Sequence, residues 1–61
     1  MPVITVQMYE GRTADQKRAL VEAITRAMVD IAKSNPEQVN VIIQDVSRSN
    51  WGMNGKLVSE S

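Results

Sequence analysis

The sequence contains no cysteine, no histidine and no phenylalanine. Without cysteine, the chain can form neither disulfides nor thiolate metal sites. Without histidine, it lacks the side chain that most often carries protons or ligates metals. We therefore expect no metal and no cofactor, and any acid–base chemistry must come from another kind of group.

An excess of charge of one sign is also missing. Seven basic residues balance seven acidic ones, and the only aromatic residues are one tryptophan and one tyrosine. Nucleic-acid-binding domains usually show a basic patch and interleaved aromatic residues. A ribbon–helix–helix DNA-binding protein of this length would also need a helix where residues 39–46 have the pattern of a strand. We expect no nucleic-acid partner.

Long hydrophobic runs are absent too. No run approaches the ~18 apolar residues of a membrane span, and the N-terminal segment lacks the pattern of a signal peptide. We therefore expect no membrane association and a cytoplasmic location.

The chain does have a hydrophobic fraction of 43%, which is too high for a disordered chain. A single small domain over residues 1–61, with no disulfide or metal to stabilise it, indicates an oligomer.

The first half of the chain has the pattern of a strand followed by a helix. Apolar and polar residues alternate over 3–8, which predicts a β-strand. Thr13 and Gln16 have the spacing of a capping box, in which each side chain bonds the other residue's backbone N–H. The periodic pattern that follows predicts a helix to about Lys33.

The second half predicts a parallel strand and a hairpin. Asn35-Pro36 ends the helix and starts a short turn. Residues 39–46 are rich in β-branched residues on both faces, as expected in a parallel sheet covered on both sides. Asn54-Gly55 is the dipeptide of a type I′ hairpin turn. The fold class is therefore α/β, a β-α-β unit with a short C-terminal β-hairpin. Because two strands and one helix are not stable alone, we expect an obligate oligomer.

Pro2 is the first candidate for catalysis. A methionine before a small residue is commonly removed, and removal of Met1 would give Pro2 a free secondary amine. Within a chain the proline nitrogen has no proton, whereas a free α-amino group titrates near ~7.7–8.0. Burial or a nearby cation lowers that pKa, so the amine can act as a general base. The alternative is a proline that merely begins an edge strand.

Four segments in this order carry a resemblance that covers essentially the whole chain: Pro2, Glu10-Gly11-Arg12-Thr13, Val41-Ile42-Ile43 and Trp51-Gly52. Together they resemble the 4-oxalocrotonate tautomerase family, the small-subunit branch of the tautomerase superfamily. The resemblance implies a homo-oligomer, a hexamer built as a trimer of dimers. It also implies an isomerase that tautomerises unsaturated 2-oxo acids of aromatic catabolism, of the 2-hydroxymuconate or phenylpyruvate type.

The resemblance also assigns roles to single residues. Pro2 matches the catalytic proline, and Arg12 matches the arginine that binds the distal carboxylate from a neighbouring subunit. Trp51 stands where the family has a phenylalanine in the apolar pocket wall. Asn40 stands in place of a second arginine. Because a neutral donor forms weaker hydrogen bonds than a cation, we expect reduced activity from this departure.

Other interpretations of these residues remain open. Arg12 could pair with Glu10 or Asp15, Trp51 could anchor a subunit interface, and Asn40 could simply occupy a strand position. Tyr9 could offer its hydroxyl to the pocket or only pack.

Two further functions also remain open. One is hydration or dehalogenation of halogenated acrylic acids, which the resemblance to this superfamily also implies. Those enzymes place a carboxylate in the hairpin to position water, and this chain has Met53 there, which disfavours water addition. The other alternative is a non-catalytic or partner subunit of a mixed oligomer, in which a different chain supplies the missing cation.

Overall fold

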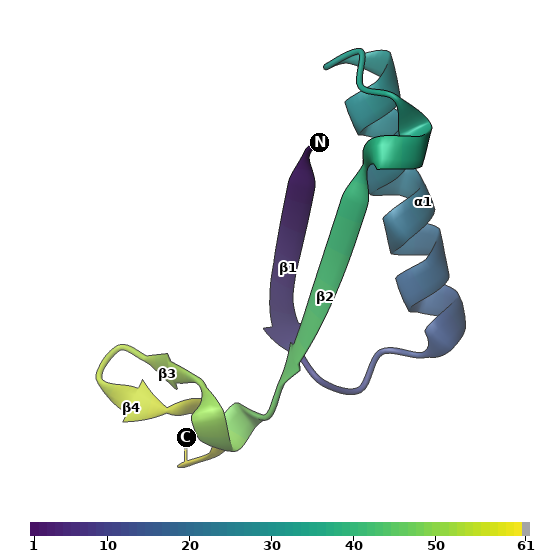
Figure 1. Ribbon diagram of the computed structural model, residues 1–61. Coiled ribbons are helices and arrows are strands. Elements are labelled where there is room, and N and C mark those ends of the chain that lie inside the picture. The colour runs from purple at the N-terminus through teal and green to yellow at the C-terminus, as the bar shows by residue number, and fades with distance from the viewer. Residues whose placement is uncertain (61) are drawn as a thin grey trace.

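The computed structural model describes residues 1–60, which form a β-α-β unit followed by a small hairpin (Figure 1). The β-α-β unit consists of β1 (Val3–Tyr9), α1 (Ala14–Asp30), the single-turn 3₁₀ segment η1 (Pro36–Gln38) and β2 (Asn40–Val46). The C-terminal part consists of η2 (Arg48–Asn50), β3 (Gly52–Met53), β4 (Lys56–Leu57) and η3 (Val58–Glu60). The predicted fold class is confirmed.

Strands β1 and β2 pair in parallel, from Val3 opposite Asn40 to Tyr9 opposite Val46. Helix α1 lies along one face of this pair (Figure 1). The alternation predicted for the first strand is observed over Val3–Met8, where every second side chain is half-buried and the ones between are exposed. The half-buried face is the one toward α1, where Met8 and Leu20 line a common pocket.

The start of α1 is as predicted. Thr13 Oγ1 accepts a hydrogen bond from the Gln16 amide at 3.1 Å, and Gln16 Oε1 accepts one from the Thr13 amide at 2.9 Å. Its predicted end at Lys33 is wrong, because the helix ends at Asp30. Lys33 has a φ of +58°, and a left-handed residue turns the chain out of a helix. The Ser34 amide then bonds the carbonyl of Met28 at 3.1 Å.

The predicted turn is also present between β3 and β4. These strands are antiparallel, with Met53 opposite Lys56. Asn54 and Gly55 have φ values of +56° and +77°, and positive φ at both central residues is what a type I′ turn requires. The hairpin projects beyond the end of β2 and away from α1 (Figure 1).

One chain does not build a core of its own. No residue among 1–60 is fully buried, and the radius of gyration is 14.5 Å, where about 10.5 Å is expected for a compact domain of this length. On the sheet face opposite α1, Val3 and Ile42 remain 56% and 47% exposed, and Met53 in the hairpin is 60% exposed. Strand β2 thus carries apolar residues on both faces, and a single chain covers only the face toward α1.

Within residues 1–60, no helix is both long enough and apolar enough to cross a bilayer.

The capping box gives a first testable prediction. Thr13→Ala removes the hydroxyl that accepts from Gln16, and loss of such a cap typically costs about 1 kcal/mol. We expect the denaturant midpoint of unfolding to fall accordingly, measured at one fixed protein concentration because association affects stability. Thr13→Ser keeps the acceptor and should unfold close to wild type. Equal losses in both variants would contradict the role of the cap.

Candidate active site

The predicted site residues lie at two opposite ends of the parallel strand pair. Pro2 and Asn40 lie at the amino end, where the Asn40 amide donates to the carbonyl of Pro2 at 3.0 Å. Pro2 is half-buried, whereas Met1 is 86% exposed. The backbone bond to β2 therefore holds Pro2 in place, and Met1 contributes little to packing within the chain.

The side chain of Asn40 is engaged locally. Its Nδ2 donates to the backbone carbonyl of Gln38 at 3.0 Å, just before β2 begins. This hydrogen bond joins two neutral groups. The amide therefore supports the local turn from η1 into β2 and brings no cation to the amino end of the sheet.

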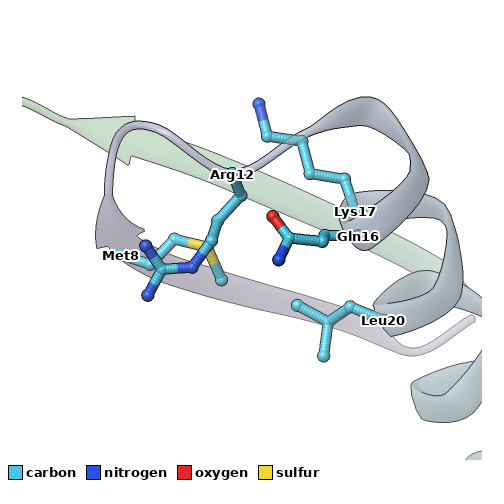
Figure 2. Close-up of a pocket in the computed structure, with 5 residues that line it drawn as sticks. All are labelled: Met8, Arg12, Gln16, Lys17 and Leu20. Carbon is cyan, nitrogen blue, oxygen red and sulfur yellow. The ribbon is translucent and has the colours of Figure 1, made fainter.

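Arg12 lies at the carboxyl end, in the loop between β1 and α1. Gly11, with a φ of +114°, turns the chain there in a conformation that side-chain-bearing residues rarely adopt. Arg12 then lines a pocket of about 210 Å³ together with Met8, Gln16, Lys17 and Leu20. Figure 2 shows the guanidinium beside Met8, with the amine of Lys17 turned away from it.

The guanidinium of Arg12 has no counter-ion within residues 1–60. Asp15, one of its possible partners, pairs instead with Arg18 at 2.6 Å. Glu10, the other possible partner, forms no salt bridge in this part of the chain. The nearby amine of Lys17 is neutralised by Asp45. Arg12 therefore presents an uncompensated cation in the pocket, which suits recognition of an anion.

Tyr9 and Trp51 meet at the same end, on the other face of β1. Their ring centroids are 4.7 Å apart in an edge-on arrangement, with 66° between the planes. Arg48, which the sequence pattern did not single out, lies over the Tyr9 ring with its Cζ 4.5 Å from the centroid. Trp51 also lines a second pocket of about 270 Å³ with Gln7, Val46, Asn50 and Gly52. Tyr9 thus packs as the central ring of a cluster.

A single chain therefore brings together Tyr9, Trp51 and, nearby, Arg12, but it keeps Pro2 apart from them. The seven residues of β1 separate the two ends by roughly 20 Å at ~3.3 Å per residue. An arginine side chain cannot reach across that distance. A site that contains both Pro2 and Arg12 requires two chains.

The known proteins that resemble this chain belong to one family. The sequence model of the tautomerase enzyme family matches residues 2–61. The chain is 40% identical over 60 residues to a protein of Halalkalibacterium halodurans named "Probable tautomerase", covering 98% of each chain. It is also 40% identical over 60 residues to the 2-hydroxymuconate tautomerase of Comamonas testosteroni, covering 98% of this chain and 95% of that one. Among solved structures, YwhB, a homologue of 4-oxalocrotonate tautomerase, superposes with a TM-score of 0.95 at 37% identity, covering 98% of each chain.

The aromatic cluster can be tested by fluorescence, because Trp51 is the only tryptophan. Tyr9→Leu removes the ring on which Trp51 packs, so we expect a red-shifted Trp51 emission and a loss of about 1 kcal/mol of stability from the aromatic pair. Tyr9→Phe keeps the ring and should leave the emission unchanged. A shift of equal size in Tyr9→Phe would show that the hydroxyl, and not the ring, positions Trp51.

Proposed function

This chain belongs to the tautomerase family, and we propose that it catalyses enol–keto tautomerisation of unsaturated 2-oxo acids with Pro2 as general base. The family match that begins at Pro2 is the main support. The structure adds that Pro2 is held by its carbonyl at the edge of the sheet while Met1 extends outward. The proposal requires that Met1 be removed, since only a free proline has a basic nitrogen.

The proton transfer needs few groups. The neutral amine of Pro2 takes the proton from the enol oxygen, and the electron pair of the O–H bond forms the carbonyl. The double bond shifts, and the protonated amine returns its proton to carbon 3 in a 1,3-transfer or to carbon 5 in a 1,5-transfer. A proton simply moves from oxygen to carbon, so no cofactor is required. Arg12, whose planar guanidinium suits bidentate carboxylate binding, orients the substrate.

We further propose that the working form is a homo-oligomer, a hexamer built as a trimer of dimers. Within residues 1–60, β1 is hydrogen-bonded to β2 alone, so its other edge can pair with a second chain. Antiparallel pairing of two β1 strands would place Pro2 of one chain beside Arg12 of the other. Further copies would cover the outer face that carries Val3 and Ile42.

Asn40 supports a second candidate function. Charge-assisted hydrogen bonds are roughly twice as strong as neutral ones, and the Asn40 amide is already bonded to Gln38. A chain without a cation at this position could be a non-catalytic partner subunit in a mixed oligomer. Activity of the purified homo-oligomer separates this candidate from the tautomerase.

The first test of the proposal is Pro2→Ala. We expect this variant to lose at least about a hundredfold in kcat, within the range that a general base contributes, with its assembly unchanged by size-exclusion chromatography. The substrates are phenylenolpyruvate and 2-hydroxymuconate, and mass spectrometry establishes that Met1 is absent. Wild-type activity in Pro2→Ala would contradict the proposal. No activity in the processed wild type, with a gain on mixing with a second tautomerase-family chain, would favour the partner subunit.

Arg12→Gln tests the carboxylate contact. We expect its KM for the dicarboxylate 2-hydroxymuconate to rise about tenfold, because a charged hydrogen bond contributes roughly 1.5–3 kcal/mol. Its KM for the monocarboxylate phenylenolpyruvate should rise less. Arg26→Gln removes the same charge from an exposed position on α1 and serves as the matched control. Equal effects of both variants would indicate a general charge effect, not a contact.

A further inference from the structure

We propose that Arg48 is a second anion-binding residue at the carboxyl end of the sheet, where it binds one carboxylate of a dicarboxylate substrate. The inference rests on the proposed function and adds to it a second residue that binds the substrate. Neither Arg48 nor its contact with Tyr9 follows from the family match. Three features of the chain support this role: Asn40 carries no charge, Arg48 lies over the Tyr9 ring, and Arg48 forms no salt bridge within residues 1–60.

A site for a dianion needs two positive groups or several placed dipoles, and Arg12 supplies one cation. Asn40 supplies none, and its amide is bonded to the carbonyl of Gln38. A second positive group for a dianion would therefore come from elsewhere in the structure.

Arg48 lies over the ring of Tyr9, with its Cζ 4.5 Å from the centroid. A cation over an aromatic face is attracted to it and keeps its charge, so Tyr9 favours this position of the exposed guanidinium. A guanidinium has five N–H donors, and contact with one ring leaves donors available for a carboxylate.

Arg48 also has no anionic partner in the described part of the chain. The salt bridges within residues 1–60 join Lys17 to Asp45 and Arg18 to Asp15, and neither involves Arg48. A guanidinium without a counter-ion suits binding of a carboxylate, because charge-assisted hydrogen bonds are the stronger ones.

The location of Arg48 agrees with a place in the substrate site. Tyr9 joins it to Trp51, whose ring lines a pocket with Asn50 and Gly52. Arg12 lies with Met8 on the face of β1 toward α1, whereas Arg48 lies with Tyr9 on the opposite face. A substrate lying across the end of β1 would therefore meet Arg12 on one side, and Arg48 together with Trp51 on the other.

The competing role for Arg48 is that of a clamp that only holds the hairpin against Tyr9. Binding of an unreactive ligand separates the two roles, and Trp51 fluorescence reports it without any chemistry. The probes are adipate, a saturated dicarboxylate, and its monomethyl ester, which carries one charge. Arg48→Gln keeps a planar group over Tyr9 and removes the charge, and Arg26→Gln is the matched control on α1.

For the anion site we expect Arg48→Gln to weaken adipate binding about tenfold, equivalent to about 1.4 kcal/mol. The Kd of the monomethyl ester, whose single carboxylate binds Arg12, should change less than twofold. Arg48→Lys keeps the charge without the planar group and should fall between Arg48→Gln and wild type. Arg26→Gln should bind both ligands like wild type.

Three results would overturn the inference: wild type that does not bind adipate, equal losses for both ligands in Arg48→Gln, or no loss for either. Equal losses together with a shifted emission in the absence of ligand would assign Arg48 to the clamp. If Arg48→Gln does not assemble, Arg48→Lys alone decides between these outcomes. These measurements need no turnover, so they are independent of the test of Pro2. If Pro2→Ala were fully active while Arg48→Gln lost adipate binding, Pro2 would not be the base but Arg48 would still be an anion-binding residue.

Discussion

Parallel pairing of β1 with β2 is the constraint on which the rest of the structure depends. The register that sets Val3 opposite Asn40 also sets Tyr9 opposite Val46, so it determines which residues share each end of the sheet. The amino end receives Pro2, and the carboxyl end receives Tyr9 and, through the following loop, Arg12. Because an extended strand cannot fold back on itself, these two groups stay apart in one chain. Catalysis of the proposed kind then becomes a property of at least two chains.

The same constraint explains the lack of a core. Two strands and one helix cover only one face of the sheet, and Val3 and Ile42 remain exposed on the other. A chain of this size could compensate with disulfides or a metal, but no cysteine or histidine is present. Association is therefore the remaining route to burial. Stability and assembly of the site would then depend on the same contacts, so a variant that weakens association should also lose the site.

The C-terminal hairpin depends on a different interaction. Its own strands are only two residues long, and short strands do not hold their position alone. The edge-on contact of Tyr9 with Trp51, and the contact of Arg48 with the Tyr9 ring, join this segment to the end of β1. This contact aligns three groups that could recognise a ligand: an aromatic wall, a hydroxyl-bearing ring and a cation. It therefore links the geometry of the site to the packing of the hairpin.

The sequence by itself determined the local elements, because their signals are carried by neighbouring residues. Thr13 with Gln16 started the helix where expected, and Asn54-Gly55 formed the expected turn. The end of α1 was placed about three residues too late, because the periodic apolar pattern continues to Ile31 whereas the helix ends at Asp30 and Lys33 adopts a left-handed conformation. The pair of Asp15 with Arg18, which leaves Arg12 free, is also local, because residues three apart on a helix are neighbours. Only the tertiary structure decided that Lys17 pairs with Asp45 and that Arg48 lies over Tyr9. These contacts depend on the distance between segments in space, and no spacing along the chain encodes that distance.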